Sequence, residues 1–303
     1  MFLLLSPKLV YSTEFYISSQ TSNAISLFNS NTLDIEQSFA VPKGPVNLLV
    51  NEDKDVFYIS HPEKGVVSVF DQKTRRLLQE IETGGQPFGM ALDTKKQKLF
   101  VTDWSRDSVL VINTVSFQVV DILAVGKSPA GIAIDTVGRK VFVANRESHT
   151  LTVLDADKPR LIAHIETGNN PYSVVFNSQK NQLYVGCVKE NSVTVIDTES
   201  YKVIASLPVK APYGFAISND GEQFFVTSQA ENKLVVFDAN TLEATSRIAT
   251  GKMPESVALS VDNQRAFVVN WFSNSISVID LQTKQQSSLV KLNNESRMIV
   301  KAQ

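Results

Sequence analysis

Seven hydrophobic segments of this chain end in Asp or Asn at an almost constant spacing. The seven residues are Asn29, Asp71, Asn113, Asp155, Asp197, Asp238 and Asp280, which lie 42 residues apart except for one step of 41. A period in the low forties with four short strand-like segments per copy is typical of a β-propeller blade. Because seven copies account for nearly the whole chain, the spacing predicts an all-β fold: a seven-bladed β-propeller with four antiparallel strands per blade.

The third copy illustrates the expected blade. Its strands are predicted over residues 87–92, 98–102, 108–112 and 118–122, each rich in β-branched and aromatic residues. The Asp or Asn that closes each third strand can accept hydrogen bonds from the following backbone N–H groups, which predicts a structural role in the turn. A series of prolines marks the start of each innermost strand, where no N–H is needed. These prolines are Pro45, Pro87, Pro129, Pro171, Pro212 and Pro254.

The copies do not begin and end in phase. The first copy starts near Phe15 without a first strand of its own, whereas residues 297–300 look like a first strand that has no partners. We therefore expect this C-terminal strand to join the N-terminal blade and close the ring, which covers exposed sheet edges. The expected organisation is an N-terminal lead-in, residues 1–12, followed by a single propeller domain, residues 13–303.

The lead-in bears on the location of the protein. Residues 2–5 are apolar and residues 10–12 are small or branched, as in the remnant of a signal peptide, but Lys8 interrupts the apolar run. A truncated signal peptide and an irregular lead-in both remain open. We expect a periplasmic or secreted protein, with the cytoplasm as the alternative, and no membrane span, because no segment approaches the ~20 apolar residues that a span needs.

Charge and cysteine content exclude several classes of protein. The formal net charge is -2 and the pI is near 6.0, which argues against general binding to polyanions. Cys187 is the only cysteine, so the chain has no internal disulfide and no CxxC metal or redox motif.

Three segments resemble the YVTN-type propeller repeat, whose consensus is roughly YVTNxxxNTVSVID. They are VFVANRESHTLTVLD from Val141, LYVGCVKENSVTVID from Leu183 and AFVVNWFSNSISVID from Ala266. The resemblance implies the propeller fold over residues 13–303 and favours an extracytoplasmic location. Members of this family and its neighbours include surface-layer and exported proteins, binders of single-stranded DNA, heme- or quinone-associated propellers and lactonase-like hydrolases. The family motif contains no catalytic residue.

The predicted ligand face lies where two sets of connections meet at one mouth of the central channel. Positions that break the repeat there are the variable residues after the proline series, namely Val46, Phe88, Ala130, Tyr172, Tyr213 and Glu255, and those after the second strand of each blade. Aromatic side chains among cations can stack on planar groups. The candidate ligand-binding residues are Trp104, Trp271, Phe272, Phe88, Tyr172, Tyr213, Arg106, Arg146 and His61. The alternative is that these aromatic side chains only pack between blades.

Catalytic signals are weaker than the aromatic one. The chain has no HExxH, GxSxG, phosphate-binding glycine loop or dinucleotide fingerprint, and no CxxCH or axial-ligand motif for a redox propeller. A lactonase-like hydrolase would need oxygen ligands converging on a divalent cation at the channel mouth. The set that could converge is Asp103, Asn145, Asn270 and Glu255, with His61 as a base.

The sequence therefore favours a non-enzymatic, monomeric propeller that presents a binding face at the channel mouth. The expected ligand is a protein, a polysaccharide or a single-stranded nucleic acid, and we expect no catalytic residue, metal or cofactor. The alternative is a metal-dependent hydrolase of the lactonase type.

Overall fold

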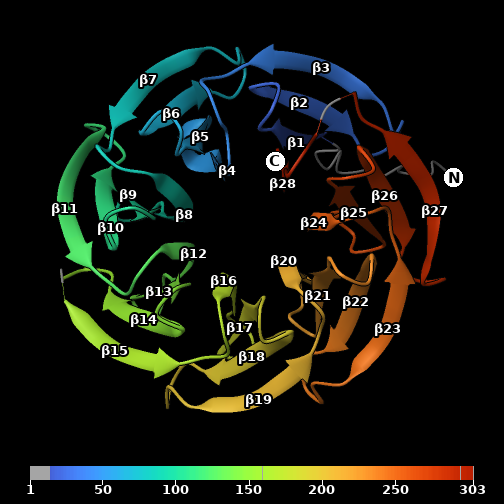
Figure 1. Ribbon diagram of the computed structural model, residues 1–303. Helices are drawn as coiled ribbons and strands as arrows, with labels where there is room; N and C mark the ends of the chain where they lie inside the picture. The colour runs from blue at the N-terminus through green and yellow to red at the C-terminus, as the bar shows by residue number, and fades with distance from the viewer. Residues whose placement is uncertain (1–13, 159, 294, 303) are drawn as a thin grey trace, which may run out of the picture.

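The computed structural model describes residues 14–158, 160–293 and 295–302. These residues form seven four-stranded antiparallel sheets arranged around a central channel (Figure 1). The predicted seven-bladed propeller is therefore confirmed. The lead-in at residues 1–12 lies outside the described residues. Within the described part of the chain, no helix has the length and hydrophobicity to cross a membrane.

Each blade runs from an innermost strand at the channel to an outermost strand at the rim (Figure 1). The first three blades comprise β28 (Met298–Lys301), β1 (Glu14–Ser19), β2 (Ala24–Asn29), β3 (Ile35–Ala40); β4 (Asn47–Asn51), β5 (Val56–His61), β6 (Val66–Asp71), β7 (Leu77–Glu82); and β8 (Pro87–Asp93), β9 (Lys98–Asp103), β10 (Ser108–Asn113), β11 (Gln118–Ala124). The next two comprise β12 (Pro129–Asp135), β13 (Lys140–Asn145), β14 (Thr150–Asp155), β15 (Leu161–Glu166); and β16 (Pro171–Asn177), β17 (Gln182–Cys187), β18 (Ser192–Asp197), β19 (Val203–Pro208). The last two comprise β20 (Pro212–Ile217), β21 (Gln223–Ser228), β22 (Lys233–Asp238), β23 (Ala244–Ala249); and β24 (Pro254–Leu259), β25 (Arg265–Asn270), β26 (Ser275–Asp280), β27 (Gln285–Lys291).

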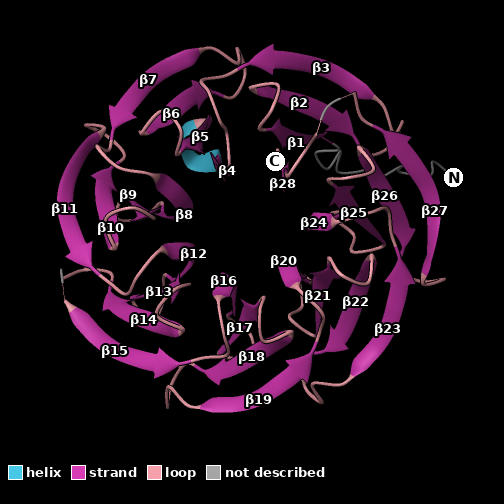
Figure 2. Ribbon diagram, viewed as in Figure 1, coloured by secondary structure: helices cyan, strands magenta, loops and turns pink. Residues whose placement is uncertain are grey.

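The ring is closed as the sequence predicts. The C-terminal strand β28 pairs antiparallel with β1, with Phe15 opposite Lys301 and Ile17 opposite Ile299. The first blade therefore combines one strand from the C-terminus with three from the N-terminus (Figure 1). Apart from these strands, the described residues contain one short 3-10 helix, Glu52–Lys54, in the connection between β4 and β5 (Figure 2).

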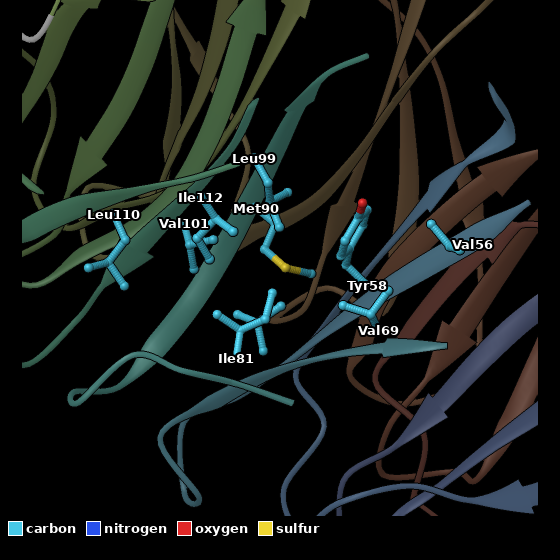
Figure 3. Packing of buried hydrophobic residues seen from close by; sticks show 10 residues of the cluster. Val56, Tyr58, Val69, Ile81, Met90, Leu99, Val101, Leu110 and Ile112 are labelled. Atoms are coloured by element: carbon cyan, nitrogen blue, oxygen red, sulfur yellow. The ribbon is translucent and has the colours of Figure 1, made fainter. Parts of the chain in front are cut away.

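The core lies between the blades. Among the described residues, one cluster of buried hydrophobic side chains fills each gap between neighbouring blades. Between the second and third blades, Tyr58 and Val69 face Met90 and Leu99 (Figure 3). A blade alone would leave both of its faces in water, so each copy of the repeat is stabilised by its neighbours.

The Asp or Asn that ends each third strand holds the next turn, as expected. Asp197 Oδ1 accepts hydrogen bonds from the Ser200 backbone N at 2.7 Å and from the Ser200 hydroxyl. The equivalent hydrogen bond, from the backbone N three residues ahead, occurs at all seven positions: Asn29, Asp71, Asn113, Asp155, Asp197, Asp238 and Asp280. At Asp197, the hydrogen bonds from Ser200 favour the ionised carboxylate and hold the pKa of this carboxyl below its usual value.

Candidate functional site

The innermost strands of all seven blades contribute to one cavity at the channel mouth. Its volume is about 480 Å³, within the range of roughly 300–1,000 Å³ that small-molecule sites occupy. The lining comes from the first residues of these strands, together with residues of the connections that follow the second strands, such as Trp104. The two sets of connections therefore meet at one mouth, as the sequence predicts.

Seven equivalent positions, one residue beyond the proline series, surround this cavity. We call them the inner ring: Val46, Phe88, Ala130, Tyr172, Tyr213, Glu255 and Arg297. Six are the variable positions identified from the sequence. The seventh, Arg297, was not among the predicted ligand-binding residues, although it follows Glu255 by the repeat distance of 42. Extending the series by one more repeat distance, to the residue before the closing strand, would have found it.

Backbone contacts between neighbouring inner strands hold the ring in position. The Thr102 hydroxyl accepts a hydrogen bond from the Gly89 N at 2.8 Å and donates one to the Ala130 carbonyl at 2.8 Å. At Gly214, a Cβ atom would overlap the backbone carbonyl of Glu255 on the next blade. Glycine is needed at such a position because two backbones approach too closely for a side chain.

Four aromatic side chains form a continuous wall, which we call the aromatic wall: Phe88, Trp104, Tyr172 and Tyr213. The ring centroids of Phe88 lie 5.3 Å from Trp104 and 5.8 Å from Tyr172, and those of Tyr172 and Tyr213 are 4.5 Å apart. These separations are those of favourable aromatic pairs. Burial raises the pKa of Tyr172 to about 12 and raises that of Tyr213 as well, so both hydroxyls are neutral near pH 7.

A charged pair lies beside the aromatic wall. Arg297 Nη1 donates to Glu255 Oε1 at 3.0 Å, and Gln229 Nε2 donates to the same oxygen at 3.4 Å. Glu255 is only 4% exposed. Burial raises the pKa of its carboxyl to about 7, although Arg297 and Gln229 act in the opposite direction. Desolvation of the carboxylate thus outweighs the attraction of one guanidinium.

The structure separates the other predicted ligand-binding residues from the cavity wall. Arg146 lies over the Trp104 ring, with its Cζ 5.5 Å from the centroid. The Trp271 ring makes a cation–π contact with the Arg297 guanidinium. Phe272 packs on Trp271 but is 62% exposed. None of these three residues lines the cavity.

Arg106 and His61 have structural contacts. Arg106 Nη1 donates to the Thr83 carbonyl at 3.2 Å. His61 is fully buried, and its Nε2 lies 2.7 Å from the Ser68 hydroxyl. Burial lowers the pKa of His61 to about 4, so it is neutral at pH 7. Sequence position alone does not distinguish a side chain that faces the channel from one that faces the neighbouring strand.

The oxygen ligands considered for a lactonase-like metal site do not converge. Asp103 Oδ1 accepts a hydrogen bond from the Gln86 N, and Asn145 Oδ1 accepts one from the Gly126 N. The Asn270 amide donates to the next strand of its own blade. All three side chains are buried away from the cavity, and Glu255 is the only member of the set that lines it. Over the described residues, no cluster of three or more His, Cys, Asp or Glu side chains is arranged to hold a metal ion.

The fold and the site define a ring-closed seven-bladed propeller with an aromatic cavity at one mouth of its channel. The model of the cytochrome D1 heme domain family matches residues 136–299, more than half of the chain. The chain belongs to the cytochrome D1 heme domain family. Since the match does not name the YVTN-type repeat, that resemblance stays a prediction. Comparison with the curated proteins gives no match.

Solved structures share the fold at low sequence identity. Hydrazine synthase from Kuenenia stuttgartiensis matches with a TM-score of 0.81 and 21% identity, over 88% of this chain and 92% of that chain. A protein of unknown function from Desulfotomaculum acetoxidans DSM 771 matches with a TM-score of 0.83 and 15% identity, over 95% and 98% of the two chains. A proposed 6-phosphogluconolactonase from Bacteroides fragilis NCTC 9343 matches with a TM-score of 0.83 and 14% identity, over 97% and 99%. Identities this low establish the shared fold alone.

The family name implies a heme, which the cavity lining would have to hold. Heme iron is held by His, Cys, Met or Tyr. The described lining contains no His and no Cys. Met90 packs in the core cluster of the second and third blades, and Met298 Sδ accepts a hydrogen bond from the Leu48 N at 3.2 Å. The raised pKa values of Tyr172 and Tyr213 oppose a tyrosinate ligand. The described lining therefore does not fit a heme that is ligated through its iron.

Proposed function

We propose that this protein is a non-enzymatic propeller that binds a small molecule with a flat apolar ring in the cavity at the channel mouth. The aromatic wall carries this proposal, because four adjacent rings line a cavity of about 480 Å³. An aromatic pair contributes about 0.5–1.5 kcal/mol beyond the burial of its area, so an inserted ring gains from several contacts at once.

Charge favours a small molecule over a nucleic acid. Arg146 Nη1 lies 3.0 Å from Glu147 Oε1, and Arg297 is paired with Glu255. Arg146, which lies over the Trp104 ring, and Arg297 are thus each paired with a carboxylate, whereas a nucleic-acid groove needs cations that are free to contact phosphates. A protein or a polysaccharide would enter this cavity only through one protruding ring.

Titration with 2-naphthamide, a neutral fused-ring probe, tests the proposal by isothermal titration calorimetry. We expect saturable binding to the wild-type protein and about tenfold weaker binding to Phe88→Ala and to Tyr213→Ala, since each loses about 1.4 kcal/mol of stacking and burial. The matched control is Val120→Ala on the outer strand β11, where the side chain is 57% exposed and far from the channel. Equal affinity in all four proteins would refute the cavity as the binding site.

Hydrolysis of a lactone is the second candidate function. Glu255 favours it, because a cavity carboxyl with a pKa of about 7 can act as a general base near neutral pH. The described lining offers no second carboxylate for a metal ion, so such a reaction would have to proceed through Glu255. Release of acid from a panel of lactones, lost in Glu255→Gln and unaffected by chelators, would support this function.

A further inference from the structure

Glu255 and Arg297 are the only charged members of the inner ring, and they lie on adjacent blades. Arg297 Nη1 contacts Glu255 Oε1 at 3.0 Å and Oε2 at 3.4 Å. Both contacts come from one nitrogen, so the pair lacks the parallel geometry in which a guanidinium and a carboxylate form two separate hydrogen bonds. The Arg297 side chain is 26% exposed and the Glu255 side chain 3%. A molecule in the cavity can therefore reach the guanidinium more easily than the carboxylate.

Arg297 is held by contacts that do not depend on Glu255. Its Cζ lies 3.8 Å from the centroid of the Trp271 ring, a close cation–π contact. Trp271 is oriented in turn by a hydrogen bond from its Nε1 to Glu295 Oε2. The Arg297 backbone N donates to the Ser18 carbonyl at 3.0 Å, which ties the residue to the first blade. The guanidinium can thus stay in place when it exchanges one carboxylate for another.

We infer that the cavity takes an organic carboxylate, whose carboxylate group binds Arg297 in place of Glu255 while its ring stacks on the aromatic wall. This inference rests on the proposed function, because it names the chemical class of the molecule that the cavity binds. Two carboxylates at one guanidinium in a buried site would repel each other, so Glu255 takes up a proton as the ligand binds. One ligand anion and one proton enter together, and the net charge of the site does not change.

The surroundings of Glu255 support this exchange. The groups that face it are Arg297 from the segment before β28, Tyr213 from β20, Tyr172 from β16 and Gln229 from the loop after β21. Both tyrosines stay neutral because burial raises their pKa values, and Gln229 does not titrate. Burial raises the pKa of Glu255 itself to about 7, so the proton is taken up near neutral pH at little cost.

A comparison of 2-naphthoate with the neutral 2-naphthamide tests the inference by calorimetry between pH 6 and pH 9. We expect the affinity of the wild-type protein for 2-naphthoate to fall about tenfold per pH unit above pH 7, because one proton is bound with the ligand. The affinity for 2-naphthamide should not change with pH. In Glu255→Gln, the affinity for 2-naphthoate should become independent of pH and exceed that of the wild-type protein about tenfold at pH 8.

Arg297→Gln should lose the preference for 2-naphthoate and keep the affinity for 2-naphthamide. Arg297→Lys retains the positive charge and should keep part of the preference, and thermal unfolding of each variant reports its folding. Equal affinities for the two probes at pH 6, or an unchanged pH slope in Glu255→Gln, would overturn the inference and leave the proposed function standing. Failure of both probes to bind the wild-type protein would overturn the two together.

Discussion

The turns at the rim and the inner ring at the channel occupy equivalent places in all seven blades. The turn residues are nearly the same in every blade, whereas the inner-ring residues vary from blade to blade. Every turn uses Asp or Asn to bind the same backbone N–H groups. The inner ring combines apolar, aromatic, acidic and basic residues around one cavity. Where each copy has the same local task, the chain repeats one solution. Where seven copies share one cavity, the residue type varies around the ring, and such variable positions are where a ligand would be recognised.

The strongest test of this comparison removes the closing strand. Deletion of residues 298–303 takes away β28, leaves the edge of β1 unpaired and uncovers Phe15 and Ile17. We expect the protein to lose its cooperative thermal unfolding transition and to aggregate, because an exposed apolar edge strand remains. Calorimetric scanning and light scattering measure both effects. A cooperative transition near that of the full chain would show that six complete blades suffice and that ring closure matters only for the cavity.

Gly214→Ala tests how tightly the inner strands are packed. The added methyl group would overlap the backbone carbonyl of Glu255, which cannot move without shifting the next blade. We expect a loss of about 3 kcal/mol in the free energy of unfolding, measured by denaturant titration. The control is Gly138→Ala, whose close neighbour is the tip of the Asp135 side chain rather than backbone, so that the carboxylate can shift at the cost of its turn hydrogen bonds alone. Comparable losses in the two variants would contradict the special role of the inner strand.

The carboxyls of the two regions should respond to pH in opposite directions. Burial raises the pKa of Glu255 to about 7, so the folded protein binds the proton more tightly than the unfolded chain does. The contribution of Glu255 to stability is therefore fully present below about pH 4.5 and is lost as the pH rises through 7, by roughly 3 kcal/mol in total. Denaturant titrations from pH 4.5 to pH 8 should show this fall in the wild-type protein and a flatter profile in Glu255→Gln. An identical profile in both would refute the raised pKa.

Asp197→Ala should have the smallest effect and the opposite pH dependence. The Ser200 backbone and hydroxyl hydrogen bonds hold the pKa of Asp197 below its usual value, so its stabilisation is present above about pH 4 and is lost in acid. We expect Asp197→Ala to lower the free energy of unfolding by about 1 kcal/mol at pH 7 and by less at pH 3. Asp197→Asn retains an acceptor and should lose less. Weaker binding of 2-naphthamide in either variant would contradict the view that the turns act only in folding and that the inner ring alone binds the ligand.

The site could be predicted in part. Phe88, Tyr172 and Tyr213 were recognisable because they are the aromatic members of a series that varies from blade to blade, and Trp104 because it breaks the repeat nearby. His61 occupies an equally variable position, but its side chain points into the blade and bonds Ser68. Direction at the end of a strand depends on the neighbouring strands, which a single repeat does not reveal.

Trp271 and Arg297 show a second limit of the sequence. Trp271 belongs to the seventh blade and Arg297 directly precedes β28, the strand that completes the first blade, so their contact exists only in the closed ring. The surroundings of Glu255 have the same origin, because Arg297 and Gln229, which contact its carboxyl group, come from other blades. Neither feature follows from spacing, since both depend on which atoms the closure brings together.

The sequence by itself determined the number of blades, the strands of each blade, the turns that join them and the closing role of the C-terminal segment. These features follow from local hydrogen bonding and from a period that repeats along the chain. Only the tertiary structure decided which variable residues share the cavity and which carboxyl is buried beside a guanidinium. Burial and charge pairing depend on distances across the ring, and those distances are set only when all seven blades pack together.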